Sequence, residues 1–226
     1  MATTPKELYR LPNPVAPRLP AATTQYEQRF QDQFTSILRL YFNQLDSVNS
    51  VLLGELGGRF FNNPYASVQR TTDFNWAAAN TPALITCNQN DYMNGATNDG
   101  TDGIHVDYAG IYNLQFSIQF ANTDSQIHTA FVWFRINGAD APGTASKFDV
   151  PNKHGSSDGY LIGACNFFLE LQAGDYVEMW AAATQVENGV TDGVYMEAYP
   201  AQTSPFAHPS IPSVVMTLSF VSTLPT

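Results

Sequence analysis

The sequence predicts a mainly β protein, an antiparallel sandwich or jelly roll, preceded by an extended proline-rich arm and one long α-helix. Charged residues make up 13% of the 226 residues and aromatic residues also 13%, and 15 Gly and 14 Pro supply turns, as is typical of all-β domains. From about residue 66 onward, apolar and polar residues alternate with period two, whereas the preceding segment follows the helical period. We therefore expect four segments: an arm at 1–24, a helix at 25–53, a glycine-containing linker at 54–65 and a β head at 66–226.

The formal net charge of −10 is unevenly distributed. Residues 1–65 hold six basic and five acidic residues, a net of +1, and residues 66–226 hold four basic and fifteen acidic residues, a net of −11. This shift supports a domain boundary near residue 65. Nucleic-acid binding depends largely on Lys and Arg contacts to phosphate, so an acidic head argues against that class of partner.

The arm contains the stretch "PNPVAPRLPAATT", with prolines at 12, 14, 17 and 20. Proline fixes φ and removes amide donors, so we expect an extended, polyproline-like segment. A disordered tail is the alternative to a peptide that docks on a partner. Docking is favoured because the arm is more apolar than a spacer, and its candidate anchor residues are Leu8, Tyr9, Leu11, Pro12, Val15, Pro17 and Leu19.

A helix is predicted over 25–53, with Thr24 as N-cap, Glu27 completing a capping box and "GELGG" ending it. Apolar residues recur along this helix at alternating spacings of four and three, which is the pattern of a coiled-coil seam, with one polar interruption at Gln44. We expect this seam to form a trimeric neck. The seam residues are Phe30, Phe34, Ile37, Tyr41, Val48 and Val51. The alternative is a helix that folds back on its own β domain.

The head contains a clear half-buried strand, "IYNLQFSIQF", in which Tyr112 to Phe120 alternate with polar residues. "TAFVWFRING" closes in Asn137-Gly138, a signal for a tight turn. "GACNFFLELQAGDYVEMWAAA" reads as two strands joined at 173–175, and "PSVVMTLSFVS" as the last of about eight strands.

Two of these segments, "FVWF" and "VEMWAAA", place apolar residues on both faces of a strand. The outer face of a sandwich in a monomer is usually polar. The additional apolar residues on the outer face of these strands therefore predict contact with further copies of the chain. The candidate core or trimer-interface aromatics are Phe131, Trp133, Phe134, Tyr176 and Trp180.

The two cysteines, Cys87 and Cys165, are expected as buried free thiols, with one disulfide as the alternative. The N-terminus lacks the apolar run of a signal peptide, and no stretch has the length of a membrane-spanning helix. We therefore expect a protein made in the cytosol that does not insert into membranes.

Four stretches of residues 66–224 resemble the C1q and tumour-necrosis-factor family of trimeric jelly rolls. They are "HVDYAGIYNLQFSIQF", "WFRINGADAP", "FFLELQAGDYVEMW" and "SVVMTLSFV", of which "LQAGDYVEMW" is the most specific. The resemblance implies a homotrimeric jelly-roll head. A collagen-like stalk, which often precedes such heads, is replaced here by the arm and the helix.

Residues 8–48 resemble the start of small structural proteins of tailed bacteriophages, particularly marine and cyanobacterial ones, through the proline-rich stretch and "LRLYFNQLD". Together the two resemblances imply a virion component assembled in the host cytoplasm and docked on capsid or tail proteins through residues 1–53. A capsid decoration, cement or head-fibre role is the leading expectation. The alternative is a tail fibre or tip whose head binds a host-surface receptor or glycan.

We find no catalytic motif and expect a protein that is not an enzyme. The histidines do not fall at metal-ligand spacings. Asp91, Asp99 and Asp102 in "NQNDYMNGATNDGTDG" are weak Ca²⁺ candidates, because Asn, Asp and Gly are also favoured in turns for backbone reasons. Glycan binding through exposed tryptophans among Trp76, Trp133 and Trp180 is a rival function.

Overall fold

The computed structural model describes residues 17–19, 21, 25–53, 63–101, 103–222 and 224, with helix side chains described as far as Asn49. The described residues divide into two compact units, helix α1 (Gln28–Leu53) and a β unit that begins at Asn63. The expected mainly β protein with one helix is confirmed. The helix begins at Gln28 and not at residue 25, and the amide of Gln31 donates to the carbonyl of Glu27 at its first turn. The proposed cap Thr24 lies outside the described residues.

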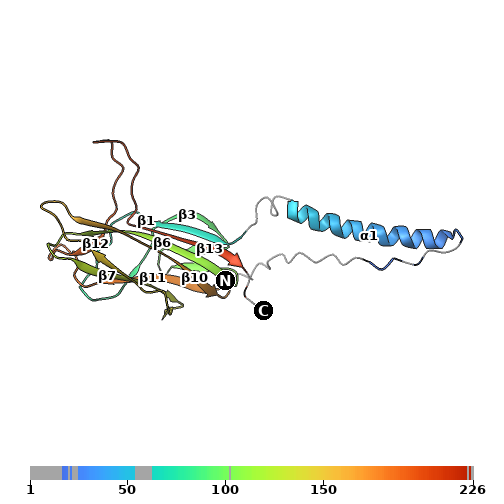
Figure 1. Ribbon diagram of the computed structural model, residues 1–226, viewed down its shortest axis with the longest axis horizontal. Helices are drawn as coiled ribbons and strands as arrows, with labels where there is room; N and C mark the ends of the chain where they lie inside the picture. Colours follow the sequence, from blue (N-terminus) through green and yellow to red (C-terminus); the bar gives the residue numbers. More distant parts are fainter. Residues whose placement is uncertain are drawn as a thin grey trace. The chain divides into compact units, whose positions relative to one another are not determined.

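The strands of the β unit form two antiparallel sheets that make a β-sandwich (Figure 1). Sheet A has the order β10-β6-β13-β1-β3, and β12 also pairs with β6. Its strands are β1 (Tyr65–Arg70), β3 (Gln89–Asn94), β6 (Gly110–Asn122), β10 (Gly159–Leu171), β12 (Val194–Met196) and β13 (Val214–Ser222).

Sheet B has the order β4-β5-β11-β7-β8, with β2 paired to β11 and β9 paired to β7. Its strands are β2 (Ala83–Ile85), β4 (Ala96–Asn98), β5 (Ile104–Val106), β7 (His128–Ile136), β8 (Ala139–Asp140), β9 (Ser146–Val150) and β11 (Tyr176–Ala183). The described part of the chain thus has thirteen strands where about eight were expected. Several of the additional strands are only two or three residues long, too short to show a hydrophobic period.

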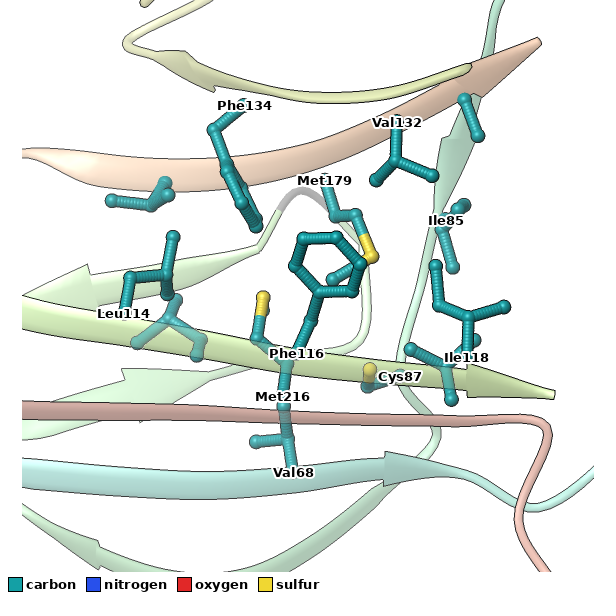
Figure 2. Close-up of a cluster of buried hydrophobic side chains, with 14 of the residues drawn as sticks. Val68, Ile85, Cys87, Leu114, Phe116, Ile118, Val132, Phe134, Met179 and Met216 are labelled. Carbon is teal, nitrogen blue, oxygen red and sulfur yellow. The ribbon is translucent and has the colours of Figure 1, made fainter. Parts of the chain in front are cut away.

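The core lies between the sheets. The alternation predicted for β6 is confirmed, because Tyr112, Leu114, Phe116, Ile118 and Phe120 are all buried. The intervening Asn113, Gln115, Ser117 and Gln119 are half-buried or exposed. Figure 2 shows side chains of β6 pointing toward those of sheet B, and the rings of Phe116 and Phe134 meet edge to face at 5.8 Å. Buried apolar area of this kind is the main stabilising contribution to such a sandwich.

Two predicted turns lie at the expected positions, but one joins strands of the same sheet and the other joins strands of different sheets. Asn137 and Gly138 both have positive φ (53° and 79°) and connect the antiparallel strands β7 and β8, as a two-residue hairpin turn requires. The turn at 173–175 also joins two strands, but β10 belongs to sheet A and β11 to sheet B. It therefore carries the chain from one layer to the other.

Cys87 and Cys165 are both free, as favoured from the sequence, but only Cys87 is buried as expected, and Cys165 is half-buried. Burial raises the pKa of the Cys87 thiol to about 11, so it remains protonated at neutral pH. Within the described residues, no helix combines the length and apolar character needed to cross a bilayer.

Candidate functional site

The edge strand β10 carries the most prominent exposed apolar row of the β unit. Strand β10 pairs with β6 on one side, and its other side is a sheet edge within the described strands. Its inward residues include the buried Leu169 and Leu171. On the opposite face, Tyr160, Ile162 and Phe168 are 55%, 63% and 64% exposed. We call these three residues the β10 row.

A hollow of about 560 Å³ lies beside Tyr160 and Ile162, the two residues of the β10 row nearest the start of the strand. Strand β6 contributes Gln119 to it, and the segment that follows β12 contributes Glu197. Strand β10 and residues 199–211, between β12 and β13, supply apolar or aromatic side chains. The lining residues are Gln119, Tyr160, Leu161, Ile162, Glu197, Tyr199, His208 and Ile211.

The polar side of this hollow is acidic. Burial, with the nearby carboxylates of Asp73 and Asp158, raises the pKa of Glu197 above its ordinary value, although a hydrogen bond from Tyr195 opposes the shift. The hydroxyl of Tyr195 donates to Glu197 Oε1 at 3.0 Å, and burial together with that carboxylate raises the pKa of Tyr195. Burial and Glu197 also raise the pKa of Tyr160. A partner that enters here should therefore be uncharged or cationic.

A second surface lies on the outer face of sheet B, where Trp133 on β7 is the register partner of Trp180 on β11. The Arg135 guanidinium carbon lies 3.9 Å from the ring centroid of Trp180, a cation–π contact. Asp140 Oδ1 accepts hydrogen bonds from Arg135 Nε (2.7 Å) and Trp133 Nε1 (2.9 Å). These two donors hold the pKa of Asp140 below its usual range. We call these four residues the Trp133 cluster.

Two buried polar atoms beside this cluster lack a hydrogen-bond partner among the described residues, Glu178 Oε2 and Trp180 Nε1. Glu178 lies opposite Arg135 in the β7–β11 register, yet the guanidinium pairs with Asp140 instead. Unpartnered buried polar atoms are uncommon in folded proteins. They mark the outer face of β11 as a place where a ligand or water would add hydrogen bonds.

The predicted head aromatics separate into core and surface. Phe134 is fully buried in the core. Trp133 and Trp180 are half-buried on the outer face of sheet B, where Phe131 is 39% exposed. Tyr176 is half-buried, and its ring lies 5.2 Å from that of His105. The surplus apolar face expected on these strands is therefore covered in part by Arg135 within the same chain.

The β10 row was not singled out from the sequence, although it has the larger exposed apolar surface. A signal was present, because "GYLIGACNFFLEL" has apolar residues at both parities and so cannot bury all of them in one core. The hollow beside the row had no signal in the sequence. Its lining residues come from β6, β10 and the segment between β12 and β13, which only the fold brings together.

Most of the predicted anchor arm lies outside the described residues, namely Leu8, Tyr9, Leu11, Pro12 and Val15. Pro17 is half-buried and Leu19 is 48% exposed. In the helix, the seam residues Phe30, Phe34, Ile37, Tyr41 and Val48 are all half-buried, and the side chain of Val51 is not described. The rings of Phe30 and Phe34 stack at 6.2 Å, whereas Leu40 and Phe42 on other faces are 61% and 59% exposed. The trimeric neck stays a prediction.

The weak calcium candidates have separate hydrogen-bond partners. Asp91 accepts hydrogen bonds from Gln69, Gln89 and Ser67, and Asp99 Oδ1 accepts from the amide and hydroxyl of Thr101. Asp102 lies outside the described residues. In the part of the chain that the structure describes, no three His, Cys, Asp or Glu side chains are grouped to hold a metal ion.

Two surfaces thus remain as candidates, the β10 row with its hollow on sheet A and the Trp133 cluster on sheet B. Comparison with protein-family models gives no match, and a search of curated proteins gives none either.

Proposed function

We propose that this chain is a non-enzymatic structural protein of a bacteriophage particle, a homotrimer that decorates or cements the capsid or forms a short head-fibre-type appendage. The arm at 1–24 docks on the particle, the helix forms the neck, and the β head is displayed outward. The observation that carries the proposal is the exposed β10 row, which fits contact with further copies of the chain. The phage origin rests on the resemblance of residues 8–48 to phage structural proteins.

The β10 row supports self-association for two reasons. Large exposed apolar side chains that cluster on one face mark interaction surfaces. An apolar edge strand also offers unpaired backbone groups, and natural proteins normally cover or charge such edges. Strand β10 carries one exposed charged residue, Glu170, near its end. A cyclic trimer would cover the row in every copy.

The connectivity supports a jelly roll of the C1q and tumour-necrosis-factor kind for the head. The first and last strands, β1 and β13, are neighbours in sheet A. Between them the chain passes from β6 in sheet A to β7 and β9 in sheet B, returns to β10, and crosses again to β11. Repeated crossing between two antiparallel sheets is how jelly rolls are connected, whereas a meander would stay within one sheet.

The solution mass of the full chain, measured by light scattering after chromatography, tests this proposal together with the mass of residues 66–226. We expect trimers for the full chain, and trimers for the head alone if the β10 row carries the symmetry. Ile162→Lys should weaken the association of the head, because it places a charge in the row. Tyr92→Lys is the matched control, since Tyr92 is 72% exposed on β3 at the other edge of sheet A.

Monomers of both the full chain and the head would contradict the proposal, and Ile162→Lys head trimers as stable as those of the wild type would contradict the role of the β10 row. Trimers of the full chain with monomers of the head would instead assign the symmetry to the helix. A position on the capsid is favoured over a tail tip, because the net charge of −11 on residues 66–226 opposes binding to an anionic cell surface.

The Trp133 cluster favours a second candidate function, a tail tip or fibre head that binds a host-surface glycan. Aromatic side chains with hydrogen-bonding neighbours suit sugar rings, and Trp133, Arg135 and Asp140 offer this combination. A glycan array compared between the wild type and Trp133→Ala tests it. Binding lost in the variant would support this function, and an array without a bound glycan would remove it.

A further inference from the structure

The segment between β12 and β13 forms a hairpin, residues 199–211, held by two pairs of backbone hydrogen bonds. Tyr199 and Ile211 exchange amide-to-carbonyl bonds of 2.8 and 2.7 Å, and Gln202 and His208 exchange bonds of 3.1 and 3.0 Å. Figure 1 shows this segment rising away from the strands of the β unit. The hairpin is therefore an ordered projection with a defined tip.

The tip carries an aromatic side chain with little cover. Phe206 is 68% exposed, and its ring contact is with His208 of the same hairpin, at 5.9 Å between centroids. Exposing a phenylalanine of this kind forgoes much of the free energy that its burial would contribute. A tip that served only as a connection would be expected to be polar.

The base of the same hairpin forms one wall of the hollow described above. Tyr199, His208 and Ile211 of the hairpin line the hollow together with Tyr160 and Ile162 of β10. Phe206 itself does not line the hollow in its own chain, although His208, whose ring it contacts, does. Phe206 is five residues from Ile211, which in an extended strand is roughly 15 Å. The chain thus presents an apolar projection and an apolar hollow that do not satisfy each other.

We propose that the hairpin is a clasp between copies of this chain, in which Phe206 of one copy enters the hollow of the next and contacts its lining residues Tyr160, Ile162, Tyr199 and Ile211. The inference rests on the self-association proposed above and names the contact that joins each copy to the next in the trimer. Projection and hollow are different surfaces, so the contact is heterologous, and a cyclic trimer fills all three hollows with three tips.

Charge supports a second copy as the occupant. Residues 199–211 contain no Asp, Glu, Lys or Arg, in a chain with a net charge of −10. Glu197 lines the hollow, and the carboxylates of Asp73 and Asp158 are close enough to raise its pKa. An acidic segment entering the hollow would be repelled, whereas an uncharged tip brings no like charge to it.

Substitution of the tip tests the clasp in the full-length chain. Phe206→Asp should raise the dissociation constant of the trimer by about tenfold or more, because it removes a buried aromatic anchor and adds a repelled charge. The matched control is Val190→Asp, which places the same charge at a 91% exposed position in the turn that precedes β12. Light scattering over a dilution series gives both constants, and circular dichroism spectra like that of the wild type show that each variant folds.

A pair of introduced cysteines provides the second test of the clasp. The double variant Phe206→Cys with Ile162→Cys should form disulfide-linked dimers and trimers on a denaturing gel under mild oxidation, and each single variant should not. A double variant that closes only within one chain, or does not close, overturns the clasp, as does a Phe206→Asp trimer as stable as the wild type. A wild-type trimer with either of these results rejects the clasp and leaves the proposed function standing. A wild-type monomer overturns both.

Discussion

The three tryptophans show how differently one residue type is used in this fold. Trp76 is 1% exposed, and its Nε1 donates to the carbonyl of Ala181 on β11 at 3.0 Å. Trp133 makes an equivalent bond at the surface, to the carboxylate of Asp140. Trp180 is half-buried beneath the guanidinium of Arg135. Only the first is a core residue whose hydrogen bond is shielded from water.

Trp76→Phe should therefore destabilise the protein, by about 2–4 kcal/mol, because it leaves a cavity and removes a buried hydrogen bond. For a domain of this size, that corresponds to a fall in Tm of roughly 5–10 °C in a calorimetric scan. Trp133→Phe is the control, since it removes a similar bond where water can replace it, and it should cost less than about 1 kcal/mol. Equal losses in the two variants would contradict this assignment.

Glu197 makes stability depend on pH. Its pKa in the folded state is raised above the ordinary value of 4.5, so its favourable contribution is complete below that value and is lost as pH rises through the folded-state pKa. Glu197→Gln keeps an acceptor for Tyr195 and removes the charge, so the variant should gain stability relative to the wild type as pH rises from about 5 to about 8.

The measurement is the difference in Tm between Glu197→Gln and the wild type across that range, with an increase of about 2 °C expected for a change below ~1 kcal/mol. Glu170→Gln, at an exposed position on β10, controls for the loss of one negative charge. A difference that is constant or shrinks as pH rises would show that burial of Glu197 is not coupled to folding.

At the scale of elements, strand β10 and helix α1 share a property: each exposes or half-exposes more apolar surface than its own unit covers. In β10 this surface is the β10 row, and in α1 it is the seam from Phe30 to Val48, whose members are all half-buried. Most helical stability in proteins comes from packing of such a face against other elements. Both elements are therefore candidates for contacts between copies.

The neck hypothesis is tested by a double substitution in the seam. Phe34→Asp with Ile37→Asp should release monomers or misfolded chains if the helix carries the symmetry, because two buried apolar side chains of three helices are replaced by charges. Leu40→Asp with Phe42→Asp adds the same charges at exposed positions and should leave the mass unchanged. Light scattering gives the mass and circular dichroism the helix content, and seam variants that stay trimeric would exclude the neck as the source of symmetry.

At the scale of the whole molecule, charge and association oppose each other. Each copy carries a net charge of −10, and 15 of its 20 acidic residues lie in residues 66–226. Bringing three such heads together costs electrostatic free energy, which salt reduces by screening. Apolar contacts must supply the association, and the uncharged hairpin 199–211 is suited to that role.

Self-association should therefore strengthen with ionic strength. Between about 0.05 and about 0.5 M NaCl the Debye length falls by roughly a factor of three, and the trimer dissociation constant should fall with it. Sedimentation equilibrium at several salt concentrations measures this dependence. Weaker association at high salt would mean that attractive ion pairs hold the copies together, which would contradict an apolar interface.

The sequence by itself determined the local features of this protein. The alternation in β6, the turn at Asn137-Gly138 and the helix that ends at Leu53 follow from periodicity and turn chemistry, which act over a few residues. The mainly β class followed from composition. Strands of two or three residues, such as β2 and β12, were missed because they carry no period of their own.

The tertiary structure alone decided which strands share a sheet and which apolar face meets water. Periodicity tells which residues of a strand lie on the same face, but pairing depends on contacts between residues far apart in the chain. Thus β10 and β11, joined by a three-residue turn, belong to different sheets, and Trp76 is core while Trp133 is surface. The hollow exists because β6, β10 and the hairpin 199–211, separated by dozens of residues, meet on one face of sheet A.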